Sequence, residues 1–476
     1  MIQSPAGAQS FYADRNSRTN VVSGQSDYTR ARIALSIGHG EAESPSGQVT
    51  FLLAANLLAR WCRCVRLIAP RGALLHPHVE SVLAPQAGTV ADGGLQIAHA
   101  ADPYGDFAPA ATPASADYHL HVAGDVPLGA YPIAGRGWLA LCGDAVGPPR
   151  QGDDSVLIGA VLAACVGSAQ AFRAVLGLPL LGPVRLSLWN LRGGTAAMDG
   201  PRFGRADLGH VYLIGCGAVG STIAYLLPLI RLTGILSLVD RDLVDASNLN
   251  RAPLFTFADI SRQKTEVAAA HLRRAGIVVH EYPEWFDDAV AAGRIFNSRP
   301  DLVVPTANDR GVRHAIQHQV PPLQIYGTTG RNWDAFLGRH IPLKEDCIAC
   351  RFPAPRPEAE PPLACATGRI PAPMPESNEA ADAALPFLST AAAALAVAEL
   401  MKAALDSYPA NPNFACLDLR GNMNDVLVYQ RPPDPTCTCA AQRTVWSRLN
   451  GRSRFAKFRG WLPASAWGGS ASSETG

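Results

Sequence analysis

The chain has 476 residues, which at roughly 100–200 residues per domain leaves room for two to four domains. Hydrophobic residues make up 48% and charged residues 17%, so each domain can bury a core, and disorder of the bulk of the chain is excluded. Lys and Arg number 41 against 40 Asp and Glu, a net charge of +1. This balance argues against a nucleic-acid binder and against a polybasic membrane surface, so we expect neither kind of partner.

The N-terminal residues 1–27 are polar and lack periodicity, which predicts a disordered tail, and they contain no apolar segment typical of a signal peptide. Two uncharged stretches, 155–172 and 383–398, are shorter than the ~20 apolar residues of a membrane span and predict buried helices. Eleven cysteines without an export signal favour reduced thiols, metal ligands or catalysis over disulfides. We therefore predict a cytoplasmic protein.

The first half of the chain has an α/β pattern. Short apolar runs at 32–37, 65–69, 119–122 and 137–142 predict strands, and helical spacing at 47–61 and 155–176 predicts helices. Residues 28–180 therefore predict a doubly wound sheet, although the loop after its first strand is not a clean phosphate loop. Residues 181–206 predict a linker, and 440–476, basic and then Gly/Ser-rich, predict a flexible tail.

A second α/β unit opens with the strongest local motif of the chain. An apolar strand at 210–214 leads into a loop with Gly215, Gly217 and Gly220, and a helix follows. Glycines let the backbone approach a phosphate, and the helix N-terminus supplies N–H donors. Asp240 ends the next strand, where a carboxylate can accept from ribose hydroxyls. Alone, this pattern indicates a nucleotide, with NAD as the default and a ligand-free turn as the alternative.

The residues after Asp240 favour a triphosphate. Asp242, Asn248, Arg251 and Lys264 follow it within 24 residues, and the two cations suit charge on phosphates better than they suit NAD. For Lys264 alone, a solvated helix surface is an equal alternative.

The motif DxDxVxxSNLNR, followed by Asp-Ile and a Lys, resembles the ThiF/MoeB/E1-like superfamily of adenylating enzymes, over about residues 208–428. These enzymes use ATP·Mg²⁺ to activate the C-terminal carboxylate of a ubiquitin-fold protein. The resemblance implies that the three glycines hold the nucleotide and that Asp240 binds the ribose. It also implies that Asn248, Arg251 and Lys264 bind phosphates, with Asp242 beside them.

The family's magnesium motif is reversed in this chain. Family members carry Asp-Asn after a strand of the DLVLD type, whereas this sequence has Asn308-Asp309. We prefer Asp309 as the Mg²⁺ ligand, because a carboxylate suits a hard cation. A helix N-cap is an equally good role for Asp309, and the two roles can coexist.

Five cysteines after the nucleotide motif carry further predictions. Many family members hold a structural zinc between two CxxC pairs, and Cys347, Cys350, Cys437 and Cys439 suit that role, although the second pair is CxC. Unrelated reduced thiols are the alternative. Cys365, within the loop 353–388, matches the cysteine that forms a thioester in many E1-like members, with a buried small hydrophobe as its alternative.

The resemblance also gives the first half a role. Superfamily enzymes work as dimers or as active and inactive copies, and an Arg reaches the nucleotide from the paired half; Arg30 and Arg32 are the candidates here. We therefore predict two Rossmann-like doubly wound α/β lobes: an inactive adenylation-like domain at 28–180 and an active ThiF/E1-type domain at 207–439. A homodimer or a pseudo-dimer within one chain would follow.

The chain most resembles E1-like enzymes of bacterial antiphage conjugation operons, which implies a ubiquitin-like protein and an E2-like enzyme as partners. One alternative is adenylation of a sulfur-carrier protein or peptide without a lasting thioester. An NAD-dependent oxidoreductase and a non-catalytic scaffold that binds a ubiquitin-like protein are the others.

Overall fold

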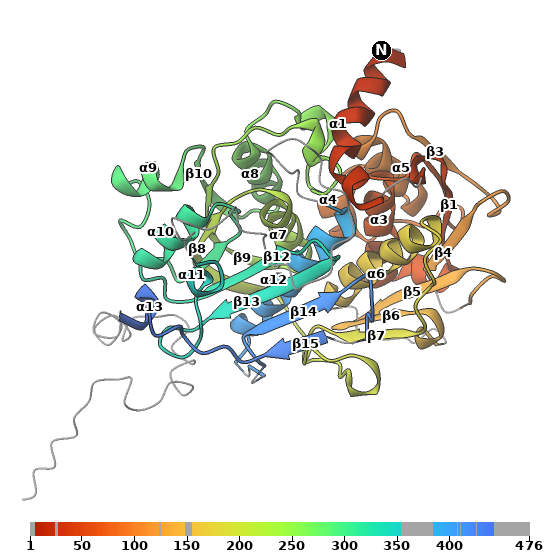
Figure 1. The fold of residues 1–476 in the computed structure, drawn as a ribbon. Helices are drawn as coiled ribbons and strands as arrows, with labels where there is room; N and C mark the ends of the chain where they lie inside the picture. The colour runs from red at the N-terminus through yellow and green to blue at the C-terminus, as the bar shows by residue number, and fades with distance from the viewer. Residues whose placement is uncertain are drawn as a thin grey trace, which may run out of the picture.

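The computed structural model describes residues 5–23, 27–122, 125–147, 155–353, 384–406, 408–409, 411–424 and 426–441. Two lobes lie side by side, each built on one sheet (Figure 1). The predicted α/β architecture with two Rossmann-like lobes is confirmed.

The first lobe has a seven-stranded sheet in the order β3-β2-β1-β4-β5-β6-β7. The first five strands in this order are parallel, and β6 and β7 are antiparallel to their neighbours. The strands are β1 (Arg32–Ile37), β2 (Cys64–Ile68), β3 (Asp106–Pro109), β4 (Tyr118–Val122), β5 (Tyr131–Arg136), β6 (Leu139–Cys142) and β7 (Val184–Ser187). The helices are α1 (Pro5–Ser23), α2 (His39–Glu43), α3 (Pro45–Ala59), α4 (Pro77–Leu83), α5 (Val90–Ala101) and α6 (Ile158–Val175).

The second lobe repeats this topology. Its sheet has the order β10-β9-β8-β11-β12-β13-β14-β15, again parallel up to the fifth strand and antiparallel beyond. The strands are β8 (Ala206–Ile214), β9 (Leu232–Val239), β10 (Val278–Tyr282), β11 (Leu302–Pro305), β12 (Gln324–Thr329), β13 (Asp334–His340), β14 (Phe414–Asp418) and β15 (Val426–Tyr429). The helices are α7 (Ala218–Leu229), α8 (Lys264–Arg274), α9 (Phe286–Ala291), α10 (Arg310–His318), α11 (Ile348–Arg351), α12 (Pro386–Ala404) and α13 (Thr438–Ala441).

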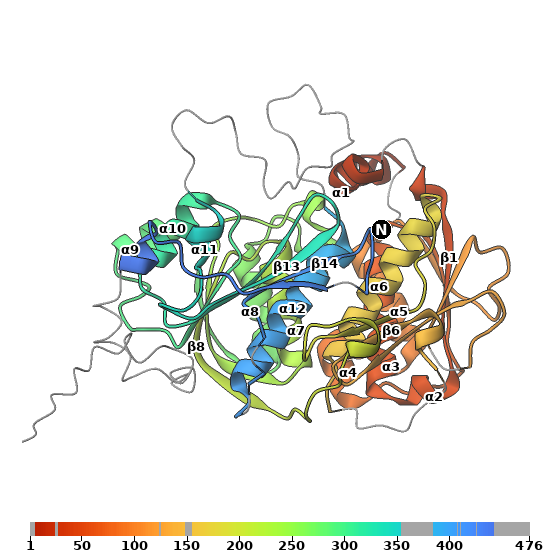
Figure 2. The ribbon, with the colours of Figure 1, turned by 60° about the horizontal axis from the view of Figure 1, so that its bottom comes forward.

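Equivalent helices hold the lobes together. Helix α6 lies between β6 and β7 in the chain and α12 between β13 and β14, and these two helices pack against each other (Figure 2). Each lies close to its own sheet because the facing strand carries a glycine. A Cβ on Gly135 would lie 2.2 Å from the Cα of Ala160, and one on Gly327 would lie 2.4 Å from the carbonyl oxygen of Ala392.

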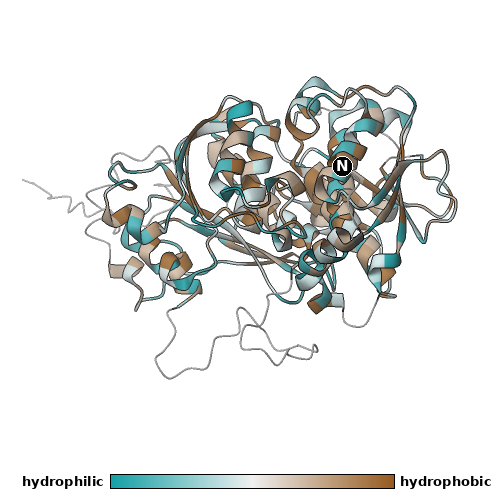
Figure 3. Ribbon diagram, turned by 90° about the horizontal axis from the view of Figure 1, so that it is seen from above, coloured by the Kyte–Doolittle hydropathy of each residue, from teal (hydrophilic) through white to brown (hydrophobic). Residues whose placement is uncertain are grey.

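Burial explains the apolar composition of these helices. By length and composition alone α6 and α12 could cross a membrane, yet 89% of α6 and 94% of α12 is buried inside the molecule. Brown, apolar residues mark the helices at the centre of the molecule in Figure 3. Both uncharged stretches are thus core helices, as the sequence predicts.

The N-terminal segment differs from its prediction as a disordered tail. Residues 5–23 form helix α1, which lies against the first lobe. Phe11 packs into the core at 5% exposure, and Arg15 forms a fully buried ion pair with Asp102 at 2.5 Å. Burial of Phe11 stabilises the helix on the lobe. The ion pair fixes its position, because either charge would be costly to bury alone.

The predicted linker 181–206 also contains regular structure. Strand β7 lies within it and pairs with β6, so the first sheet continues past residue 180. Val184 and Leu186 alternate into the core, which gives this short segment a reason to be a strand.

Candidate active site

The glycine loop joins β8 to α7, and each of its glycines has a distinct reason to lack a side chain. Gly215 has a φ of +95°, and a Cβ there would lie 2.6 Å from the backbone nitrogen of Ala307. A Cβ on Gly220 would lie 1.9 Å from the carbonyl oxygen of Gly215, so this glycine lets α7 pack against the loop. Gly217 has open space around its Cα and lines a cavity. The first helical turn of α7 therefore faces a space that a ligand can enter.

Asp240 follows β9 and lies across from this loop. Its carboxylate accepts from the backbone N–H groups of Cys216 at 2.6 Å and of Asp242 at 2.8 Å. Burial raises the pKa of Asp240 above its ordinary value. Two oxygens offer about four acceptor positions, so this carboxylate can still accept from ribose hydroxyls.

Lys264 begins α8 and lies beside Asp242. Its Nζ is 2.8 Å from a carboxylate oxygen of Asp242, and the residue is only 7% exposed. The alternative of a solvated surface lysine is therefore wrong. A nearly buried ammonium group with one carboxylate partner keeps donors available for an anion.

Arg251 lies on the loop after the short 3₁₀ helix at Ala246–Asn248. Its Nη1 donates to the carbonyl oxygen of Ser247 at 2.6 Å and to the amide oxygen of Asn250 at 2.9 Å. Ser389, on α12, donates its hydroxyl to the carbonyl oxygen of Arg251. These contacts hold both the guanidinium and the backbone of Arg251 at the cavity.

A cavity of about 470 Å³ joins these elements, a volume typical of small-ligand sites. Cations outnumber carboxylates in its wall, although the whole chain is nearly neutral. This concentration of positive charge suits a polyanion. The charged lining residues are Arg18, Arg241, Arg251, Lys264, Arg313 and Arg331 against Asp240, Asp242, Glu284 and Asp309.

Residues 204–439 match the model of the ThiF family. The second lobe is a ThiF-family domain. The match covers the glycine loop, the Arg251 loop, Lys264 and the four clustered cysteines.

Several known proteins resemble the chain. The uncharacterized protein y4jF of Sinorhizobium fredii is 28% identical over 228 residues, which are 46% of this chain and 43% of that protein. The adenylyltransferase and sulfurtransferase MOCS3 of Bos taurus is 26% identical over 306 residues, which are 62% of this chain and 63% of that enzyme. The human ubiquitin-like modifier-activating enzyme 7 is 32% identical over 133 residues, 25% of this chain and 13% of that enzyme. The chain thus spans less than two thirds of each relative.

Among solved structures, E. coli MccB with ATP superposes with a TM-score of 0.35 and 20% identity, over 50% of this chain and 67% of that one.

The ThiF domain also places Asn308 and Asp309 on the cavity wall. Asp309 is the N-cap of α10 and accepts from the backbone N–H of Val312 at 2.9 Å, so its predicted capping role is present. Asn308 accepts from Arg313 at 3.5 Å. Both side chains bring oxygen atoms, the ligand type that a hard cation prefers, to the cavity wall.

Two predicted nucleotide residues serve the fold instead of the cavity wall. The side-chain oxygen of Asn248 accepts from the backbone N–H of Asp245 at 3.1 Å in a capping box, and Asn248 does not line the cavity. Gly220 likewise packs α7 against the loop and is absent from the lining.

The arginine expected from the paired half comes from an unexpected element. Arg30 pairs with Asp27 and Arg32 with Asp117, both on the exposed surface away from the cavity. Arg18 of α1 lines the cavity instead. The buried residues of α1 include positions 11, 15, 19 and 23, a helical stripe. Three of these four are polar, so hydrophobic periodicity could not reveal the helix.

The four predicted zinc ligands of the ThiF domain converge. The sulfur atoms of Cys347, Cys350, Cys437 and Cys439 all lie within 4.8 Å of one another, and the closest pairs are 3.4–3.6 Å apart. Four thiolates at about 2.3 Å from one zinc ion would stand roughly 3.8 Å apart, so the cluster fits Zn²⁺. The tighter CxC spacing is no obstacle.

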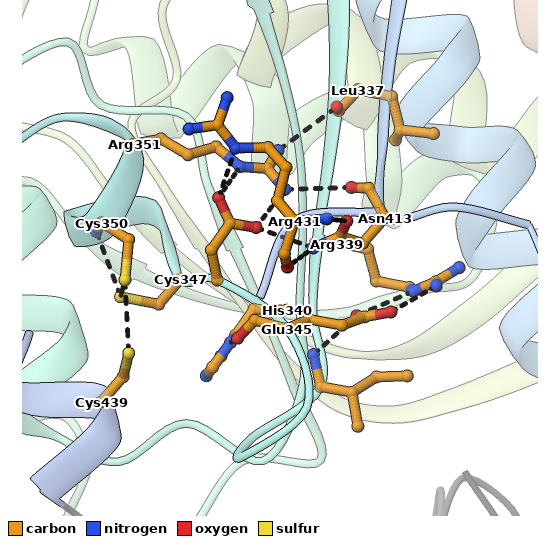
Figure 4. A network of polar contacts seen from close by, with 12 residues as sticks. Leu337, Arg339, His340, Glu345, Cys347, Cys350, Arg351, Asn413, Arg431 and Cys439 are labelled. Carbon is orange, nitrogen blue, oxygen red and sulfur yellow. Dashed lines mark hydrogen bonds and ion pairs between the residues drawn. The ribbon is translucent and has the colours of Figure 1, made fainter. Parts of the chain in front are cut away.

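Beside this cluster, ion pairs of the buried Asp346 hold the same chain segments together (Figure 4). Asp346 pairs with Arg351 at 2.7 Å and with Arg431 at 3.0 Å, and Asn413 donates to it at 2.7 Å. The C-terminal segment is thus attached to the lobe by charged contacts beside the cysteine cluster. Cys365 and most of its loop lie outside the described residues.

Proposed function

We propose that this protein is an E1-like enzyme that adenylates the C-terminal carboxylate of a ubiquitin-like protein with ATP and Mg²⁺. The observation that carries the proposal is the single cavity that joins the glycine loop, Asp240 and cations from both lobes. Both MOCS3 and the ubiquitin-like modifier-activating enzyme carry activation chemistry in their names, which supports the same class here.

In this mechanism the residues of the chain bind, orient and neutralise charge. Asp240 would accept from the ribose hydroxyls, and the N–H groups at the start of α7 would face the phosphates. As the substrate carboxylate attacks the α-phosphorus and pyrophosphate leaves, Arg251, Lys264 and Arg18 would stabilise the negative charge. Asp309, with Asn308 beside it, would hold Mg²⁺, which supplies further charge neutralisation at the phosphates.

The proposal continues after adenylation. The Cys365 thiolate would displace AMP to form a thioester, and an E2-like partner would accept the acyl group. The cysteine cluster would hold structural Zn²⁺. The repeated topology supports a pseudo-dimer within one chain, in which the first lobe is the inactive copy. We propose a cytoplasmic role in antiphage defence.

ATP–pyrophosphate exchange with candidate ubiquitin-like proteins tests the first step. We expect exchange in the wild type and its loss in Arg251→Ala. Arg262→Ala is the matched control, because Arg262 pairs with Asp259 and Glu266 outside the cavity. Exchange that survives Arg251→Ala would refute the site assignment, and a wild type inactive with every candidate would favour the scaffold.

A second candidate function is adenylation of a sulfur-carrier protein or peptide without a lasting thioester. The alignment with MOCS3 favours it, because it covers 62% of this chain, against 46% for y4jF and 25% for the human modifier-activating enzyme. The two candidates differ at Cys365. E1-like chemistry predicts a substrate adduct that dithiothreitol releases and that Cys365→Ala abolishes. Pyrophosphate exchange without such an adduct would support the alternative.

A further inference from the structure

Two side chains of the first lobe reach across the interface to the loop that carries Arg251. Asn56 lies near the end of α3, and Arg60 directly follows that helix. The guanidinium of Arg60 donates to the carbonyl oxygens of Leu249 at 2.6 Å, Pro253 at 2.8 Å and Phe255 at 3.0 Å. One side chain therefore bonds to three backbone carbonyls of a seven-residue loop.

Asn56 completes this arrangement. Its amide nitrogen donates to the carbonyl oxygen of Pro253 at 3.2 Å, and its amide oxygen accepts from Nε of Arg60 at 2.7 Å. Asn56 thus orients the guanidinium and adds a second donor to the same loop. A guanidinium is planar and its N–H groups form a rigid fork, so carbonyls bound to it have little freedom to move.

The position of Arg251 within the loop gives these bonds their consequence. Arg251 lies two residues after Leu249 and two residues before Pro253, both of which bind Arg60. When the carbonyls on either side are fixed, the direction in which the Arg251 side chain leaves the backbone is fixed as well. The fixed direction of the Arg251 side chain matters, because a donor stabilises negative charge on a ligand best when it is already in place.

The burial of Arg60 indicates that these bonds serve a purpose beyond filling space. Arg60 is 1% exposed, and burial lowers the pKa of its guanidinium to about 9. Its bonding partners in the described part of the chain are carbonyl and amide oxygens, and no carboxylate pairs with it there. A buried cation without a counter-charge is costly, so its bonds to the loop must offset that cost. An apolar side chain in its place would leave three buried carbonyl oxygens without this donor.

We infer that Arg60 is a positioning residue for Arg251, so that the first lobe sets the shape of the nucleotide loop in the second. The inference rests on the proposed function, since it assigns Arg60 a part in nucleotide binding. It also gives the motif-free lobe a specific task. Thr19 of α1 accepts from Asn250 at 3.1 Å, so a second element of the first lobe contacts the same loop.

A double-mutant cycle tests the inference. Arg60→Met should weaken ATP·Mg²⁺ binding about tenfold in titration calorimetry, because it removes the fork but keeps a long apolar side chain. In an Arg251→Ala background the same change should have little further effect, since Arg60 acts through Arg251. Full additivity of the two changes would overturn the inference. Arg60→Lys keeps the charge, loses the fork and should give an intermediate affinity, and it serves if Arg60→Met does not fold.

Hydrogen exchange provides a readout that needs no activity. The amides of Arg251 and of residues 254–255 should exchange faster in Arg60→Met than in the wild type. The matched control is His78→Ala, which removes another bond between the lobes, from His78 to the carbonyl oxygen of Leu229 at the far end of α7. Unchanged loop exchange in Arg60→Met, or equal loosening in His78→Ala, would overturn the inference. A wild type that binds no ATP·Mg²⁺ would instead refute the proposed function.

Discussion

Arg18, on the N-terminal helix α1, offers the sharpest test of a site formed by both lobes. Arg18 lines the cavity from α1, whereas the rest of the cavity wall comes from the second lobe. Replacing Arg18 by Ala removes one cation from the wall. It leaves the anchors of α1, Phe11 and the Arg15–Asp102 ion pair, in place.

The expected loss of activity in Arg18→Ala follows from the loss of one hydrogen bond to a phosphate. A hydrogen bond between a guanidinium and a phosphate contributes about 1.5–3 kcal/mol, which corresponds to roughly a 10-fold to 150-fold loss in kcat/KM for ATP. The melting temperature should change little, because Ala is a good helix former and Arg18 lies outside the buried stripe of α1. Arg18→Ala should therefore lose activity without a comparable loss of stability.

The assay is ATP–pyrophosphate exchange across a range of ATP concentrations, with calorimetric ATP binding as a second readout. Arg30→Ala is the matched control, since Arg30 is one of the two arginines predicted from the sequence and its side chain is 88% exposed beside Asp27. Equal activity of Arg18→Ala and Arg30→Ala would refute a contribution of α1 to nucleotide binding. A loss in Arg30→Ala alone would restore the prediction made from the sequence.

Three further predictions concern stability. Cys437→Ser should lose about one equivalent of zinc by metal analysis. With zinc at 100 times its Kd, the free energy of unfolding should fall by about 2.7 kcal/mol. A metal-free wild type would contradict the zinc-binding role of the cysteine cluster. Arg15→Met should cost about 3–5 kcal/mol in urea unfolding, because it leaves the fully buried Asp102 carboxylate unpaired, and a cost below 1 kcal/mol would contradict this. Burial and the neighbouring Asp418 raise the pKa of Asp334 to about 6. Between about pH 4 and pH 6 this carboxyl group is therefore ionised in the unfolded chain but still protonated in the folded one. The free energy of unfolding should fall as pH rises through this window and should stay lower above it. Asp334→Asn should remove this pH dependence and, after allowance for solvent screening, raise the free energy of unfolding by ~2 kcal/mol at pH 7. A variant whose stability varies with pH as the wild type does would contradict this prediction.

The sequence predicts which residues gather around the glycine loop, because these residues lie close together in the chain. Gly215, Gly217, Asp240 and Lys264 occupy one strand–loop–helix unit and the segment after it, so local spacing nearly determines their geometry. Spacing could not separate residues that face the cavity from residues that shape the loop. Asn248, for example, belongs to a capping box, whereas Arg251, three residues later in the same motif, lines the cavity wall.

Contributions from the first lobe were harder to predict, since they depend on contacts between distant segments. The stripe that holds α1 to the lobe is mostly polar, and its anchor Arg15 finds its partner 87 residues away. Arg60 looks like any arginine at a helix end, and its carbonyl partners lie more than 180 residues further along the chain. Hydrophobic periodicity detects neither kind of contact, because both are polar and long-range.

The α/β class of the two sheets was predictable from the sequence pattern, whereas their equivalence followed only from the family resemblance. Strand β2 ends at Ile68 and is followed by Ala69, where the equivalent strand β9 is followed by Asp240. The α2–α3 region begins directly after β1 without the glycine pattern that precedes α7. The first lobe therefore keeps the strand order and the crossover helix of the second, while it lacks the glycine pattern and the aspartate that line the cavity there. Its contacts with the second lobe come from α6 against α12, from Arg60 on the Arg251 loop and, through the N-terminal helix α1, from Arg18 at the cavity. Such contacts are expected if the second lobe needs the first to complete its site, and the loop bonds of Arg60 make that dependence measurable.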